Sequence, residues 1–293
     1  MADQRKKQIA PDPLSPESLK KLGIRLGIPL VAAWVLVLVF GGTTLKIVLG
    51  VLTSGIAGLV YWAVSRGQRQ KAVADILHNA DTKEARKEAI EKLDATFKKD
   101  DLAAAFAKSQ LQMQEDPRAA LKTLEAINLS KVLAHEADEA RAQRAMIHLI
   151  LGETDEARAL VDPIDLSRHK EAKNRASLTA IIGEAWARSG QAKRAVDLLE
   201  KLDPNDEAYV DLKPQLLRSR AFAYAWASDT KQMKHTLKLM KALNVQFLMG
   251  FITKKKNPMG VASRGVHPLL EKEAFDMVMK SGAISRKMEI RRG

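Results

Sequence analysis

The chain has 293 residues, of which 48 are Lys or Arg and 35 are Asp or Glu, so its formal net charge is +13. This excess favours acidic partners such as anionic lipid, nucleic acid or acidic proteins. The absence of cysteine excludes a disulfide framework, a thiolate metal site and a thiol nucleophile. Aromatic residues are only 5% of the chain, while Ala, Leu, Lys and Glu are abundant, and this bias predicts an all-α fold.

The first region, residues 1–21, reads as a basic tail. It contains a basic run at 5–7 and three prolines, Pro11, Pro13 and Pro16. Such a composition is typical of a solvated segment without a core of its own. The tail therefore precedes the first folded element.

Two strongly apolar runs at 22–65 predict a transmembrane helical hairpin. The runs 22–42 and 47–64 each have about the length that a helix needs to cross a bilayer, and the short link between them requires antiparallel helices. Small residues recur at every fourth position of the second run, where they allow another helix to approach closely. These candidate packing residues are Gly50, Ser54 and Gly58.

Basic residues on both sides of the hairpin predict its orientation. The rule that positive charge stays inside then puts both termini in the cytoplasm. We therefore expect an integral membrane protein, in a bacterial inner membrane, that contacts lipid through the hairpin and its basic flanks. The basic residues are Lys20 and Lys21 before the hairpin, Arg25 near the start of its first run, Lys46 in the link, and Arg66, Arg69 and Lys71 after it.

Two alternatives compete with this interpretation. Residues 28–40 have the length of the apolar part of a secretory signal peptide, but the segment before them is long for one and no A-x-A cleavage site follows closely. The two runs could instead form a buried hairpin in a soluble domain, although helices that are apolar on every face are hard to cover in a domain of this size.

An internal repeat follows, at 102–246, after a helical linker or capping region at 66–101. Its turn positions Gln114, Gly152, Gly190 and Ser228 are 38 residues apart, which indicates a series of helix pairs. The second helix of each pair contains a small or apolar residue five positions after the turn and another apolar residue further along. These residues are Ala119, Ala157, Ala195 and Met233, and Leu124, Val161, Leu199 and Leu237.

The unit at 176–204 resembles the tetratricopeptide-repeat family. Its residues follow the family's order of large, small, aromatic, turn glycine, small and large side chains, although the period of 38 exceeds the family's usual length of about 34. Close packing explains the pattern, because small residues let the two helices approach while large ones fill the space around them. The matching residues are Ile182, Gly183, Trp186, Gly190, Ala195, Leu199 and Pro204.

The resemblance implies an α-solenoid in which the first helix of each pair lines a concave face. Concave faces of this family bind peptides or protein segments. The paired Lys and Asn of the family's clamp for C-terminal carboxylates are not found here. The candidate partner-binding residues on this face are Ala142, Met146, Glu184, Arg188, Arg218 and Phe222.

No motif of enzymes, cofactors or metals is present. The six histidines lack H-E-x-x-H spacing, and no phosphate-binding glycine loop or G-x-S-x-G elbow occurs. We therefore expect no catalytic, cofactor or metal site and no small-molecule substrate.

The C-terminal extension, 247–293, is basic and contains an amphipathic helix at about 267–281. This helix could cap the last apolar face of the solenoid, or the basic residues of the extension could contact anionic lipid or an acidic partner. Nucleic-acid binding is not expected, because the Lys and Arg residues are not interleaved with aromatic side chains on which nucleobases could stack.

These features together predict a membrane-anchored, tetratricopeptide-like scaffold or adaptor that mediates protein–protein interaction at the cytoplasmic face of a membrane. The alternative is an accessory subunit of a membrane transport or envelope complex, in which the hairpin makes the working contacts.

Overall fold

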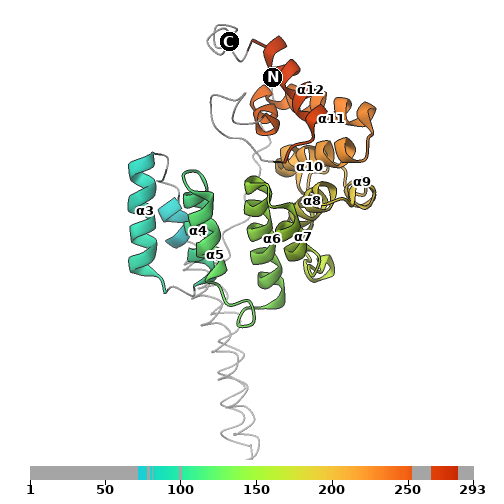
Figure 1. Ribbon diagram of the computed structural model, residues 1–293. Helices are drawn as coiled ribbons and strands as arrows, with labels where there is room; N and C mark the ends of the chain where they lie inside the picture. The colour runs from blue at the N-terminus through green and yellow to red at the C-terminus, as the bar shows by residue number, and fades with distance from the viewer. Residues whose placement is uncertain (1–71, 78–79, 81, 99–100, 253–264, 283–293) are drawn as a thin grey trace, which may run out of the picture. The chain divides into compact units, whose positions relative to one another are not determined.

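The computed structural model describes residues 72–77, 80, 82–98, 101–252 and 265–282 (Figure 1). Every regular element in these ranges is a helix, which confirms the all-α class. The chain divides into two compact units, 1–89 and 90–293, with the boundary inside α3 (Lys83–Thr96). The helices that bear on function belong to the second unit.

Four helix pairs follow α3, and they form a helical repeat (Figure 1). The second helix of each of the first three pairs also packs against the first helix of the next, so that α5 contacts α6, α7 contacts α8, and α9 contacts α10. The first helices of the last three pairs contact each other in turn. The pairs are α4 (Leu102–Met113) and α5 (Pro117–Glu125), α6 (Ala134–Leu151) and α7 (Thr154–Val161), α8 (Ala172–Arg188) and α9 (Ala192–Leu199), and α10 (Lys213–Trp226) and α11 (Thr230–Leu243).

Three of the four predicted turns share one backbone conformation. Gly152, Gly190 and Ser228 have φ angles of 83°, 90° and 62°, which lie in the left-handed region that ends many helices. Gln114 differs, with a φ of −72°. The helix after this turn, α5, is capped by Asp116, whose carboxylate accepts hydrogen bonds from two backbone amides. A proline follows Asp116 at the first helical position.

Ser228 is the non-glycine residue in this left-handed set, so Ser228→Gly is expected to stabilise the protein. The left-handed region costs about 1–2 kcal/mol for a residue with a Cβ atom, and the greater freedom of glycine in the unfolded chain offsets part of the gain. We expect the free energy of unfolding, measured in urea, to rise by about 0.5–1 kcal/mol. Ser189→Gly is the matched control, because Ser189 has a φ of −105°. No gain at Ser228, or an equal gain at Ser189, would contradict the prediction.

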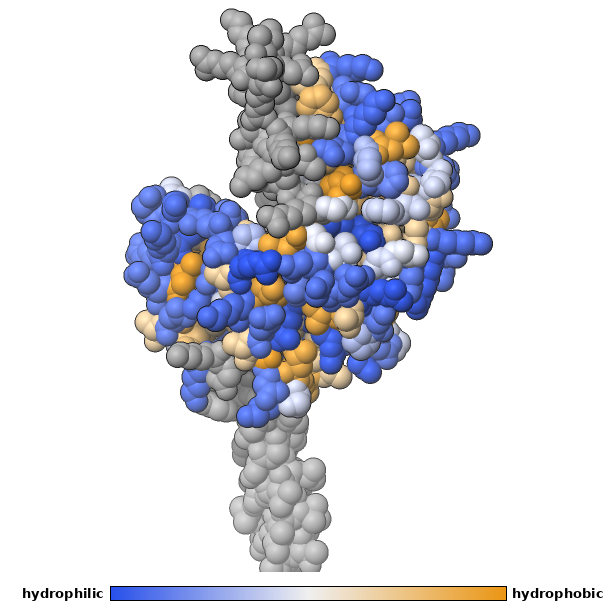
Figure 2. All heavy atoms as spheres, viewed as in Figure 1, coloured by the Kyte–Doolittle hydropathy of each residue, from blue (hydrophilic) through white to orange (hydrophobic). Residues whose placement is uncertain are grey.

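The predicted core positions of the second helices are buried. Leu124, Val161, Leu199 and Leu237 are at most 1% exposed. Ala157, Ala195 and Met233, which lie five residues after the three left-handed turns, are fully buried as well. Ala119, the corresponding residue after Gln114, is half-buried. On the face in Figure 2, hydrophilic residues accordingly cover most of the described surface, and hydrophobic residues form small patches.

Polar contacts repeat with the same period. Trp186 Nε1 donates a hydrogen bond to Asp162 Oδ1 at 2.8 Å, and Tyr224 Oη donates one to Glu200 Oε1 at 2.9 Å. Donor and acceptor in the second pair each lie 38 residues after their counterparts in the first. Burial and this hydrogen bond to Glu200 raise the pKa of Tyr224 to about 12. The 38-residue period therefore extends from the core to the contacts between successive pairs.

The last helix, α12 (Pro268–Lys280), matches the amphipathic helix predicted at 267–281. Its residues Leu270, Ala274 and Val278 are fully buried in the same cluster as α10, α11 and the short helix η3 (Val245–Phe251). This packing favours the capping interpretation of the C-terminal helix. Two further short 3₁₀ helices, η1 (Leu166–Arg168) and η2 (Val210–Leu212), precede α8 and α10.

The structure contradicts the predicted integral membrane localisation with cytoplasmic termini. Within the described ranges, no helix is both long enough and apolar enough to cross a membrane. The longest, α6 with 18 residues, carries charged side chains such as Glu136, Asp138 and Arg141. The runs predicted as transmembrane helices, 22–42 and 47–64, and the packing residues Gly50, Ser54 and Gly58 lie outside the described residues.

Candidate functional site

Four of the six residues predicted for the concave face meet in one cluster. Arg188 Nη1 donates to Glu184 Oε1 at 2.7 Å within α8. From α10, Arg218 Nε donates to Glu184 Oε2 at 3.0 Å and Nη2 donates to Oε1 at 3.1 Å. One carboxylate thus joins two arginines and two helices.

An aromatic side chain lies on the other side of these arginines. The guanidinium carbons of Arg188 and Arg218 are 4.8 and 5.1 Å from the ring centroid of Phe222, within the range of cation–π attraction. Phe251 meets Phe222 edge to face, with ring centroids 5.3 Å apart. Burial raises the pKa of Glu184, but Arg218 and Arg188 lower it by more, so this pKa lies below its ordinary value.

The remaining two predicted residues, Ala142 and Met146, lie on α6 and belong to a separate apolar cluster with α7 and α8. Ala142, Glu184, Arg188 and Phe222 are buried, whereas Met146 and Arg218 are partly exposed. Most of the predicted lining therefore contacts other parts of the chain. A partner-binding role for these six residues stays a prediction.

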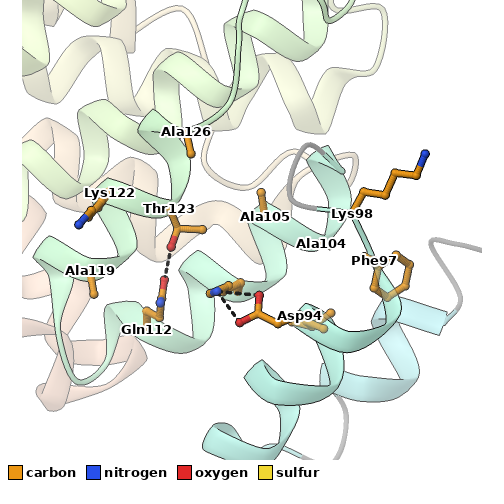
Figure 3. Close-up of a pocket in the computed structure, with 12 residues that line it drawn as sticks. Asp94, Phe97, Lys98, Ala104, Ala105, Gln112, Ala119, Lys122, Thr123 and Ala126 are labelled. Atoms are coloured by element: carbon orange, nitrogen blue, oxygen red, sulfur yellow. Dashed lines mark hydrogen bonds and ion pairs between the residues drawn. The ribbon is translucent and has the colours of Figure 1, made fainter.

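A groove lies over α4 in the described part of the second unit (Figure 3). It has a volume of about 590 Å³. Helix α4 forms its floor, and α5 and the end of α3 form its walls. Its apolar lining consists of Leu93, Phe97, Ala104, Ala105, Ala119 and Ala126.

Helix capping and residue spacing position this lining. The Asp101 side chain accepts a hydrogen bond from the amide of Ala104 at 3.1 Å, which starts α4 at the base of the groove. Residues 104, 108 and 112 are four apart and therefore share one face of α4, as do 119 and 122 of α5 and residue 126 at its C-terminal end. Alanine at four of the lining positions leaves the space that larger side chains would fill.

The groove carries an excess of positive charge, because three lysines and one aspartate line it. Lys108 Nζ lies 2.7 Å from both carboxylate oxygens of Asp94. Lys98 and Lys122 are exposed and have no ion-pair partner among the residues that the structure describes. Figure 3 shows them on opposite sides of α4, one near the end of α3 and one on α5.

The other polar groups of the groove bind one another. Thr123 Oγ1 donates to Gln112 Oε1 at 2.7 Å, and Asp94 is held by Lys108. No histidine is in the lining, and the described ranges contain no group of three His, Asp or Glu side chains that could hold a metal ion. The exposed lysines give the groove a positive charge that is suited to attracting an anionic group.

The sequence pattern did not predict this groove. The sequence predicts a helical linker or capping region at 66–101, and Gln114 is there only one of the turn positions of the repeat. The available signal was the set of small residues on α4 and α5, since alanine on facing helices can leave a hollow.

No family model, no curated protein and no solved structure matches this chain.

Proposed function

We propose that this chain is a non-enzymatic scaffold or adaptor whose tetratricopeptide-like helical repeats bind acidic protein segments, and that the groove over α4 is a binding site for them. The observation that carries the proposal is the combination of a mostly apolar lining with two exposed lysines, Lys98 and Lys122, on opposite sides of α4.

The chemistry of the lining favours a chain segment over a small ligand. A small-molecule site normally orients its ligand with a few precisely placed polar groups. Here the short polar side chains bind each other, and the lysines are long and flexible, so they select for charge rather than for one geometry. A segment with carboxylates and small apolar side chains matches both the apolar part of the lining and the lysines.

The helical repeat supports the same class of function. Gly183, Trp186 and Leu199 resemble the tetratricopeptide pattern, and concave faces of that family bind peptides or protein segments. Stacked pairs also present extended surfaces on a rigid scaffold, which suits a protein that brings others together.

Panning a random peptide library displayed on phage against the full-length chain tests the proposal. We expect the enriched peptides to be rich in Asp and Glu. In fluorescence anisotropy, the double variant Lys98→Glu/Lys122→Glu should bind them at least about tenfold more weakly, because two attractive charges become repulsive. Binding to the unmodified chain should also weaken as salt is added.

The matched control is Lys131→Glu/Lys170→Glu, which makes the same charge change at exposed lysines outside the groove. This variant should keep most of the affinity, and circular dichroism should show both variants folded. Enriched peptides without acidic residues, or equal losses in the two variants, would refute the groove as the site.

A further inference from the structure

An ion pair lies inside the groove over α4. Lys108 Nζ of α4 is 2.7 Å from both carboxylate oxygens of Asp94, which belongs to α3. Asp94 is the acidic residue of the groove lining, and Lys108 is the least exposed of the lining lysines, with 24% of its side chain exposed. The pair therefore neutralises one of the three positive charges that the lysines bring to the groove.

Another carboxylate can take the place of Asp94 at little cost. The Asp94 side chain is 56% exposed, so it can turn into water. An exposed ion pair contributes little to stability, because water and salt screen both charges. The ammonium group of Lys108 has three donor hydrogens on a flexible stem, so it can bind an incoming carboxylate in the same way as it binds Asp94.

Lys108 also lies on the path between the two exposed lysines of the groove. Lys98 lies near the end of α3 and Lys122 lies on α5, on opposite sides of α4 (Figure 3). Lys108 belongs to α4 itself, and the dashed lines in Figure 3 mark its contact with Asp94 between these two sides. A segment that bridges Lys98 and Lys122 therefore crosses α4 where the ion pair lies.

We infer that Asp94 competes with an acidic partner segment for Lys108, and that the bound segment displaces Asp94, so that three lysines rather than two hold its carboxylates. This inference rests on the proposed function of the groove. Because Asp94 belongs to the same chain, it is present beside Lys108 at a high effective concentration. A single carboxylate displaces it poorly, whereas a segment that also pairs with Lys98 and Lys122 gains enough attraction to do so. Asp94 thereby makes the groove selective for segments with several acidic residues.

Two substitutions that break the pair from opposite sides test the inference. The probe is a short fluorescein-labelled peptide of alternating Glu and Ala, titrated with the full-length chain and followed by fluorescence anisotropy. Asp94→Asn removes the competing charge, so we expect it to tighten binding at least about threefold. Lys108→Met removes the ammonium group and leaves Asp94 to repel the peptide, so we expect it to weaken binding at least about threefold. If the pair served only to fasten α3 to α4, both variants would change the affinity in the same direction.

A double variant separates the contact with Lys108 from the change in net charge. Removing the Asp94 charge makes the groove more positive whether or not Lys108 is present. Long-range attraction alone therefore predicts the same gain from Asp94→Asn in the unmodified chain and in Lys108→Met. The inference predicts a gain at least about twofold larger when Lys108 is present.

Two controls accompany these variants. Asp197→Asn makes the same chemical change at a residue that is exposed on α9, outside the groove, and it should leave the affinity nearly unchanged. Binding of a neutral peptide of alternating Gln and Ala should not respond to Asp94→Asn. Circular dichroism should show that all variants stay folded.

Three outcomes would overturn the inference. They are an unchanged or lowered affinity in Asp94→Asn, a raised affinity in Lys108→Met, and equal gains from Asp94→Asn with and without Lys108. If one of these occurs while Lys98→Glu/Lys122→Glu still weakens binding, the groove remains the binding site and only the role of Asp94 is refuted. If the peptide binds neither the unmodified chain nor Asp94→Asn, the proposed function is refuted together with the inference.

Discussion

Replacing Glu184 with glutamine is expected to lower the free energy of unfolding by about 3–5 kcal/mol, because loss of one partner from a buried ion pair leaves charge in a place that excludes water. The Glu184 carboxylate faces the guanidinium groups of Arg188 and Arg218, and the Arg188 side chain is 0% exposed. Glutamine keeps the size of the side chain but removes its charge. The variant therefore tests the electrostatic role rather than the packing.

Urea unfolding followed by circular dichroism measures this effect. The matched control is Glu156→Gln, since Glu156 is exposed on α7 and the same change there should alter stability by no more than about 0.5 kcal/mol. Similar small effects at both positions would contradict a central role for the Glu184 cluster.

The pH dependence of stability gives a second measurement on the same variant. Burial raises the pKa of Glu184, and the stronger opposing effect of Arg218 and Arg188 leaves it below the ordinary value of 4.5. A carboxyl group with a lowered pKa in the folded state contributes stability above its unfolded pKa and loses it as the pH falls through the folded pKa. Between pH 7 and pH 3, the unmodified chain should therefore lose more stability than Glu184→Gln, with the difference arising below about pH 4.5.

The sequence predicts the repeat well because the repeat depends on local chemistry. A left-handed turn favours glycine, so Gly152 and Gly190 mark the ends of α6 and α8, and Ser228 follows from the period alone. Close helix contact favours small residues, so Ala157 and Ala195 mark the buried side of the second helices. These signals act over a few residues and can be seen in the sequence.

The buried ion pairs could not be predicted in this way. Glu184 and Arg188 are four residues apart, which in a sequence is typical of an exposed pair on a helix surface. Only the packing of α10 brings Arg218, 34 residues away, to the same carboxylate. Asp138 is similar, because it is fully buried and pairs with Arg141 nearby and with Arg168, 30 residues away. Their burial depends on how separate helices pack.

The groove was missed for a related reason. A cavity forms where side chains are absent, and Ala104, Ala105 and Ala119 look in the sequence like ordinary helix-forming residues. Their effect depends on three helices that meet around the same space. The lysines on its walls, Lys98 and Lys122, likewise gain meaning only from their positions on opposite sides of α4.

Replacing Gly183 with alanine is expected to destabilise the protein by about 1–3 kcal/mol, because added atoms in a packed core force side chains or backbone to move. A Cβ atom at Gly183 would lie 2.6 Å from Leu199 Cγ and 2.8 Å from each of its two methyl carbons. Leu199 is fully buried on α9, so it has little room to move. The glycine therefore lets α8 and α9 approach closely in the unit that most resembles a tetratricopeptide repeat.

The sign of this effect makes the test decisive. In a helix interior, alanine is otherwise more favourable than glycine by about 1 kcal/mol, so a helix pair that could separate easily would be stabilised by Gly183→Ala. A double-mutant cycle with Leu199→Ala isolates the contact. Leu199→Ala alone should cost about 2–5 kcal/mol through the cavity it leaves. The double variant should then be at least about 1 kcal/mol more stable than the sum of the single effects predicts, because the new methyl group enters the space that the leucine vacates. If the two single effects on the free energy of unfolding in urea are additive, then the contact between an added Cβ atom at residue 183 and Leu199 does not limit how closely α8 and α9 pack.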